Sequence, residues 1–209
     1  LGLVSDPKLT LDRLAAALEE TMTPAQKATA QARVAASGEA KEQALAAQLE
    51  ADKAVRGNVP MHASRFMEEL AQHVPDDLIV FDEALTSSPP LTRYMPPTKP
   101  GHFFQTRGGS LGVGIPGALG VKLACPDKTV IGFTGDGGSM YTIQALWTAV
   151  RHNIGAKFVI CNNQSYMLLK LNIMQYWREQ GVKDGVFPDS FDLTGPVVDF
   201  VAMSESMGV

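Results

Sequence analysis

Three short apolar runs separate polar and glycine-rich stretches in the second part of the chain. They cover residues 77–81, 129–133 and 157–161, and each is followed by polar or glycine-rich residues. Runs of this length that are nearly all apolar are typical of strands buried on both faces of a parallel sheet. We therefore predict these three segments as strands of one sheet.

Helical spacing of apolar residues lies between the predicted strands. It predicts one helix that ends at Pro75, one that follows a glycine-rich turn at residues 108–120 and ends near Pro126, and one over residues 141–152. In the last helix the spacing predicts one buried face, made of Ile143, Leu146, Trp147 and Val150. Strands alternating with helices indicate a doubly wound parallel α/β sheet with helices on both faces, over residues 60–209. The stretch 86–100 is predicted as a long loop, and loops of that length are often functional.

The first 59 residues have a different pattern. Leucines at positions 9, 11, 14 and 18 predict a short amphipathic helix that ends near Pro24, where Thr23 and Gln26 form a capping box. A second helix, rich in Ala, Gln, Glu and Lys, is predicted up to Val55 with one break at Gly38. Few large apolar residues favour a solvated helical linker arm at the end of a preceding domain, with a partner-binding helix as the alternative.

Composition excludes several classes of protein. The net charge is −4 and no long basic run occurs, which argues against nucleic acid or an anionic membrane as a partner. No window reaches the apolar length of a membrane span, and two cysteines are too few for a disulfide framework. These features predict a cytoplasmic protein with free thiols at Cys125 and Cys161. The chain ends in a helical pattern where a further strand is expected, so we expect a domain truncated at its C-terminus.

Two of the predicted strands end in residues that carry chemistry. One is followed by Gly135, Asp136, Gly137 and Gly138, and the other by Asn162 and Asn163. A dinucleotide fingerprint would require glycine at position 140, where Met140 stands, and a phosphate-binding P-loop would require a lysine that is absent. What is left is a flexible turn that leads into a helix, whose free N–H groups suit a phosphate.

Asp136 would repel a phosphate unless a cation lay between them. Mg²⁺ prefers oxygen ligands, which the Asp136 carboxylate, the Asn163 amide, the Ser165 carbonyl and a diphosphate would supply. Because the carboxyl ends of parallel strands meet at one edge of the sheet, these groups are expected to lie together. The alternative is that Asp136 caps the next helix while the asparagines form a turn.

The Gly135-Asp136-Gly137 motif, with Asn163 lying 28 positions after Gly135, resembles the motif of thiamine-diphosphate enzymes. Its flanks at residues 108–134 and 138–169 are similar to the benzoylformate decarboxylase and acetolactate synthase branch. The resemblance implies Mg²⁺ ligation by Asp136, Asn163 and Ser165. It also implies diphosphate contacts from Thr86 and from backbone groups of Gly137, Gly138, Ser139, Tyr166 and Met167.

The same resemblance implies how the other end of the cofactor is held. Leu111 matches the bulky apolar residue that wedges thiamine diphosphate into a bent shape, and the Gly109 carbonyl would accept from its amino group. The alternative for Leu111 is an ordinary core residue. Gly138 departs from the family, in which serine is frequent at that position.

The resemblance implies part of a 2-keto acid decarboxylase similar to benzoylformate decarboxylase. The alternatives are part of an acetolactate synthase-like carboligase, or a non-catalytic module that binds a nucleotide or diphosphate. The family takes its catalytic glutamate from a pyrimidine-binding domain of the same or another subunit of a homo-oligomer. We therefore expect no catalytic residue here and no turnover by this chain alone. Glu83 is expected to be a solvated residue at a strand end, and His102 a surface histidine.

Overall fold

The computed structural model describes residue 2, residues 4–106 and residues 108–209. It separates into two compact units, Leu1–Ala54 and Val55–Val209. The sequence places the boundary at residues 59 and 60, and that assignment stays a prediction.

The first unit is helical, with α1 (Pro7–Thr21) and α2 (Pro24–Val55). The predicted capping box is present, because the Thr23 N–H donates to Oε1 of Gln26 at 2.8 Å and the Gln26 N–H donates to Oγ1 of Thr23 at 3.3 Å. The predicted break at Gly38 is wrong, since α2 is continuous through it. One glycine costs a helix about 1 kcal/mol, which the neighbouring alanines, glutamates and lysines offset. In the part of the chain that the structure describes, every helix is too short or too polar to cross a membrane.

The second unit contains a parallel sheet with the order β2-β1-β3-β4. Its strands are β1 (Ile79–Glu83), β2 (Phe103–Gln105), β3 (Val130–Gly135) and β4 (Lys157–Cys161). The three predicted strands are confirmed, with bounds shifted by up to two residues. Strand β2 was not predicted, because a strand of three residues at the sheet edge, with two of them exposed, forms no apolar run.

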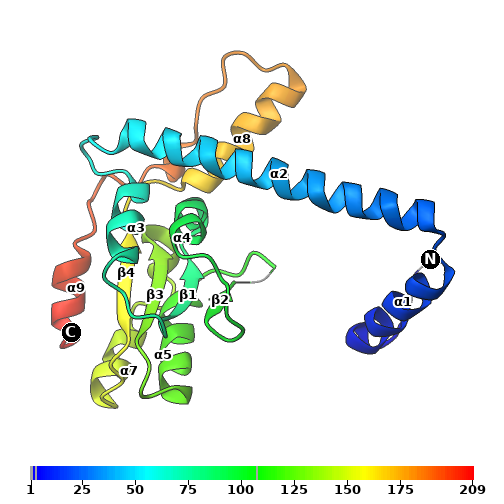
Figure 1. Cartoon of the computed structure of the whole chain (residues 1–209). Helices are drawn as coiled ribbons and strands as arrows, with labels where there is room; N and C mark the ends of the chain where they lie inside the picture. The colour runs from blue at the N-terminus through cyan, green and yellow to red at the C-terminus, as the bar shows by residue number, and fades with distance from the viewer. Residues whose placement is uncertain (1, 3, 107) are drawn as a thin grey trace. The chain divides into compact units, whose positions relative to one another are not determined.

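Helices cover both faces of this sheet, which confirms the doubly wound α/β class (Figure 1). On one face α3 (Ala63–Ala71) and α4 (Ser88–Tyr94) pack through Met67 and Leu91. On the other, α5 (Gly114–Ala124) and α7 (Ala145–Arg151) pack through Ala118 and Leu146. The remaining elements are η1 (Leu85–Ser87), α6 (Asp136–Ser139), α8 (Met167–Gln180), η2 (Asp189–Phe191) and α9 (Phe200–Ser206).

Two further predictions about helices are corrected. The stretch 86–100 is not a simple loop, since η1 and α4 extend through its first half to Tyr94. Pro89 and Pro90 stand in the first turn of α4, where proline is tolerated. The helix predicted over residues 141–152 begins only at Ala145 as α7. Of its predicted buried face, Ile143 and Leu146 are buried, whereas Trp147 and Val150 are 54% and 45% exposed.

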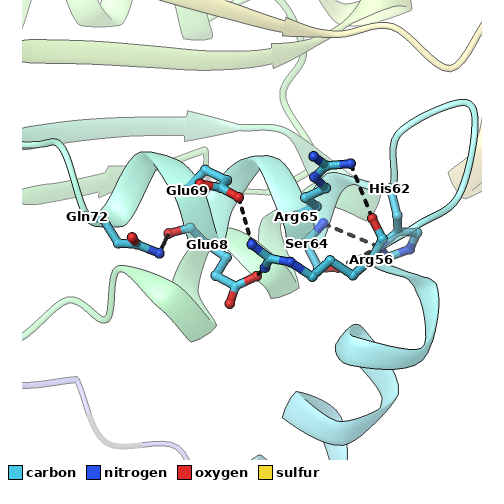
Figure 2. A network of polar contacts seen from close by, with 7 residues as sticks. All are labelled: Arg56, His62, Ser64, Arg65, Glu68, Glu69 and Gln72. Carbon is cyan, nitrogen blue, oxygen red and sulfur yellow. Dashed lines mark hydrogen bonds and ion pairs between the residues drawn. The ribbon is translucent and has the colours of Figure 1, made fainter.

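A polar network fixes the chain where the second unit begins (Figure 2). Arg56 forms ion pairs with Glu68 and with Glu69, the latter at 2.7 Å, and both glutamates lie on α3. Nδ1 of His62 lies 2.7 Å from Oγ of Ser64 and accepts the Ser64 N–H at 3.3 Å, which caps the first turn of α3. These contacts orient α3 before it packs on the sheet.

The strand order places a crevice between β1 and β3. Strand β2, which follows β1 in the sequence, lies on one side of β1, and β3, which comes next, lies on its other side. The order in which the strands are added to the sheet therefore reverses between β1 and β3. Ligands of open parallel sheets bind at such a reversal, outside the carboxyl ends of the strands. The ends in question are Glu83 and Gly135.

Candidate functional site

A cavity of about 440 Å³ lies at the carboxyl ends of β1, β3 and β4. The segments that surround it come from the turn after β1, the glycine-rich turn before α5, the start of α6 and the start of α8. Its lining includes all but one of the residues predicted to hold the cofactor or metal, namely Thr86, Gly109, Leu111, Asp136, Gly137, Gly138, Asn163, Ser165, Tyr166 and Met167. The exception is Ser139, which is buried and donates its hydroxyl to the Asp136 carbonyl at 2.7 Å.

Asp136 presents an unpaired carboxylate oxygen in this cavity. The residue is 7% exposed, and its Oδ1 accepts the Gly137 N–H at 2.8 Å. Its Oδ2 is buried and has no hydrogen-bond partner. Leaving a charged acceptor unpaired costs more than 1 kcal/mol, so buried orphans of this kind usually mark a ligand or an ion. The bond from the Gly137 N–H to Oδ1 therefore leaves the second oxygen of the carboxylate for a ligand.

The asparagines form the turns that the alternative interpretation expected. Oδ1 of Asn163 accepts the Ser165 N–H at 3.0 Å, and Oδ1 of Asn162 accepts the Gln164 N–H at 3.2 Å. An amide oxygen has two lone pairs, so the turn leaves Asn163 one lone pair for a cation. A carboxylate with neutral oxygens around it fits a hard divalent cation such as Mg²⁺. Among the described residues no cluster of three His, Cys, Asp or Glu side chains offers a different metal site.

The start of α8 faces the cavity with free backbone donors. The Tyr166 N–H donates to the Phe191 carbonyl and the Met167 N–H to the Ser165 carbonyl, so both are already used within the chain. The next two residues, Leu168 and Leu169, also line the cavity, and no side chain caps this helix. First-turn N–H groups have no partner within a helix, so those of Leu168 and Leu169 are the donors that suit an anionic ligand. The resemblance had not pointed to these two leucines.

The glycine-rich turn brings Leu111 to the cavity. Leu111 is 39% exposed and lines the cavity with Gly109, so the alternative that it is a core residue is wrong. The next residue, Gly112, has φ +82°, and a Cβ at that position would lie 2.6 Å from Cβ of Tyr141. Oγ1 of Thr142 donates to the Gly112 carbonyl at 2.6 Å. Only glycine fits both the backbone conformation and the close approach of Tyr141.

Glu83 is not the solvated residue that the sequence predicted. It is 1% exposed, and its carboxylate accepts the N–H groups of Gly112, at 2.5 Å, and Gly114. In the sequence, Glu83 stands as a single acid at a strand end. The signal that this prediction missed was the glycine-rich turn itself, which supplies unpaired N–H groups next to a parallel strand.

Two further polar residues, Cys161 and His102, differ in whether they line the cavity. Cys161 is the last residue of β4 and lines the cavity as a free thiol. Burial raises the pKa of this thiol, and a hydrogen bond from Ser87 lowers it. The charges of Asp82 and Asp136 raise this pKa further. His102 lies away from the site. It is half-buried, its Nδ1 is hydrogen-bonded to the Leu78 carbonyl at 3.0 Å, and it lines a separate hollow near Pro75 and Pro96.

Comparison with known proteins places this site in a family. Residues 86–209 match the family described as "Thiamine pyrophosphate enzyme, C-terminal TPP binding domain". The benzoylformate decarboxylase of Pseudomonas aeruginosa is 32% identical over 150 residues, which are 72% of this chain and 27% of that protein. The acetolactate synthase large subunit of Buchnera aphidicola subsp. Acyrthosiphon pisum is 39% identical over 116 residues, or 55% of this chain and 19% of that one.

A solved structure shows the same fold. The thiamine diphosphate-dependent 4-hydroxybenzoylformate decarboxylase of Rhodococcus jostii RHA1 superposes with a TM-score of 0.62 at 31% identity, over 71% of this chain and 26% of that one. The chain thus spans about a quarter of the length of these decarboxylases. With the cavity, the unpaired Asp136 oxygen and the family match together, the chain belongs to the thiamine pyrophosphate enzymes, within their C-terminal TPP-binding domain.

Proposed function

We propose that this chain binds the Mg²⁺–diphosphate end of thiamine diphosphate as part of a 2-keto acid decarboxylase. The observation that carries the proposal is the buried, unpaired Oδ2 of Asp136, a residue that lines the cavity. Mg²⁺ would be held by Asp136, by the side chain of Asn163 and by the carbonyl of Ser165. The diphosphate would lie against Gly137, Gly138 and the first turn of α8, with Thr86 at its far side.

The chain's own residues would perform binding and orientation rather than proton transfer. When bound, thiamine diphosphate supplies the electron sink for breaking the bond between a keto carbon and its carboxylate. Leu111 would press on the middle of the cofactor, and the Gly109 carbonyl would accept from its amino group. The apolar wall of Leu168 and Leu169 would keep water from this end of the site.

The proposal of a decarboxylase rests on two relatives that match about seven tenths of this chain. The benzoylformate decarboxylase covers 72% of this chain, and the 4-hydroxybenzoylformate decarboxylase covers 71%. An acetolactate synthase-like carboligase is the second candidate, supported by the 39% identity to the Buchnera protein. In either case a pyrimidine-binding domain, in the same or another subunit of a homo-oligomer, would supply the catalytic glutamate. We expect the purified 209-residue chain to turn over no 2-keto acid.

Calorimetric titration of thiamine diphosphate tests the binding function. Binding to the wild-type chain should require Mg²⁺ and should be lost in Asp136→Ala. Asp127→Ala is the matched control, because Asp127 is an exposed acid at the amino end of β3, away from the cavity. Binding that persists without Mg²⁺, or in Asp136→Ala, would contradict the proposal. Turnover of benzoylformate by the chain alone would contradict the need for a second domain.

A further inference from the structure

Glu83 lies between two loops of the site, the glycine-rich turn that carries Leu111 and the loop that carries Asp136. It is the last residue of β1, it is 1% exposed, and it lines a neighbouring hollow with Asp82 and Gln105 rather than the proposed cofactor cavity. A buried carboxylate persists only where its oxygens are hydrogen-bonded. Both oxygens of Glu83 are bonded to one loop, the glycine-rich turn that carries Leu111.

The contacts of Glu83 fix this turn at two backbone N–H groups. Oε1 accepts the Gly112 N–H at 2.5 Å, and Oε2 accepts the Gly114 N–H in the first turn of α5. Negative charge at a helix N-terminus is favourable, and bonds to an ionised acceptor are about twice as strong as neutral ones. Thr142 donates to the Gly112 carbonyl, so both backbone polar groups of Gly112 are hydrogen-bonded.

The same carboxylate also touches the loop that carries Asp136. A Cβ at Gly138 would lie 2.9 Å from Oε1 of Glu83, and a Cβ at Gly114 would lie 2.8 Å from Oε2. Glycine at both positions therefore lets the two loops close around one side chain. Glu83 lies at the point where three segments meet: the end of β1, the turn with Leu111, and the start of α6.

We propose that Glu83 is a positioning residue, whose carboxylate holds Leu111 and Gly109 at the distance from Asp136 that the ring end of thiamine diphosphate requires. Glu83 does not touch the cofactor and takes no proton from it. This inference rests on the proposed function, and it adds a separate determinant for the ring end of the site. The diphosphate end would depend on Asp136 and Asn163, and only the ring end would depend on Glu83.

Hydrogen exchange without any ligand tests the holding of the turn. In Glu83→Gln, one of the two N–H groups faces an amide donor instead of an acceptor, so exchange across residues 108–114 should rise roughly tenfold. Exchange in β3, across residues 130–134, should stay at the wild-type rate. Asp82→Asn is the matched control, because Asp82 is equally buried but bonds Ala84, Ser88 and Gln105. It should accelerate exchange in residues 84–88 and not in 108–114.

Calorimetry with two ligands tests the role at the site. For Glu83→Gln, affinity for thiamine diphosphate with Mg²⁺ should fall by about tenfold or more, while affinity for inorganic diphosphate with Mg²⁺ should change by less than about threefold. Asp136→Ala should lose both ligands. Equal losses for the two ligands, or equal acceleration of exchange in both segments, would overturn the proposal, since a general loss of stability acts on both.

The two proposals fail in different ways. If the wild-type chain binds neither ligand with Mg²⁺, the proposed function fails. Faster exchange confined to residues 108–114 in Glu83→Gln would still support the holding of the turn, and unchanged exchange there would overturn it.

Discussion

At the scale of single residues, the unpaired Oδ2 of Asp136 costs the folded chain about 1–3 kcal/mol when no cation is present. Asp136→Asn removes the buried charge but keeps an oxygen to accept the Gly137 N–H. We expect this variant to have a free energy of unfolding equal to the wild type or up to about 1 kcal/mol higher in a metal chelator. Urea unfolding measures it.

With ligand, the wild-type chain should have a higher free energy of unfolding than Asp136→Asn. Mg²⁺ with diphosphate should stabilise the wild type by mass action, by about 2.7 kcal/mol at a hundredfold excess over Kd, and leave Asp136→Asn unchanged. Asp127→Asn should behave as the wild type under both conditions. A variant at Asp136 that loses more than about 1 kcal/mol in chelator would show that the carboxylate stabilises the fold by itself.

The thiol of Cys161 reports the charge of Asp136. Burial raises the pKa of Cys161, and the carboxylates of Asp82 and Asp136 add to this rise. At neutral pH the thiol is therefore protonated and should react slowly with alkylating reagents, with a rate that increases as the pH rises. In a Cys125→Ser background, Asp136→Asn lowers the pKa of Cys161, so alkylation at pH 8 should become about twofold faster. An unchanged or slower rate would contradict this account.

Site residues were predictable from the sequence to different degrees. Asp136 and Asn163 could be found because each follows an apolar strand, and parallel strands bring their carboxyl ends together. Glu83 could not, because its burial depends on where the turn before α5 folds back, 29 and 31 residues later. The hydrogen bond that occupies the Tyr166 N–H also escaped prediction, since the Phe191 carbonyl comes from the distant η2 segment.

At the scale of elements, α2 shows that a single exposed glycine does not interrupt a helix with strong formers on both sides. Nothing lies within 4 Å of a Cβ at Gly38. Gly38→Ala should therefore stabilise the helix by about 0.5–1 kcal/mol, and thermal unfolding followed by circular dichroism at 222 nm measures the change. Gly38→Pro should lower the helical signal instead. No change in Gly38→Ala would mean that α2 does not contribute to the cooperative transition.

Helix α5 contains a matched pair of glycines with opposite surroundings. A Cβ at Gly117 would lie 2.4 Å from the ring of Phe81, whereas nothing lies within 4 Å of a Cβ at Gly120. Gly117→Ala should destabilise the fold by about 1–3 kcal/mol, because α5 must move away from the sheet. Gly120→Ala should stabilise it by about 0.5–1 kcal/mol, because only the helix propensity changes. Denaturant unfolding of both variants measures the difference, and equal effects would contradict the packing of α5 on β1.

Elements were predicted well where local pattern and tertiary structure agree. Strands β1, β3 and β4 lie inside the sheet or carry a continuous apolar run, so the sequence identifies them. Strand β2 has three residues at the edge, and its partners come from the neighbouring β1. Trp147 has helical spacing with Ile143, but it is exposed and lies next to Arg151, whose guanidinium is 5.3 Å from the ring centre. Which apolar residues of a helix become buried depends on how many neighbouring helices cover that helix.

At the scale of the whole molecule, α8 is a helix that leaves its apolar side chains uncovered. None of its residues is buried, although it starts at the cavity and carries several large apolar side chains. Leu171, Met174 and Tyr176 are 45%, 37% and 57% exposed. Several large apolar side chains exposed on one helix are typical of an interface. Since this chain spans about a quarter of the length of related decarboxylases, we expect this surface to be covered by further protein in a longer chain.

In the purified 209-residue chain, the α8 surface should be covered by a second copy. Light scattering at high concentration should give a mass above the 22.4 kDa of one chain, and dilution should restore that value. The double variant Leu171→Gln with Tyr176→Gln should shift association to a concentration about tenfold higher or more, because burial of a large apolar side chain contributes about 1.5–3 kcal/mol. Val34→Gln is the control, since Val34 is 74% exposed on α2 and lies outside α8. A mass of one chain at every concentration would contradict association through α8, and an equal effect of Val34→Gln would locate the contact elsewhere.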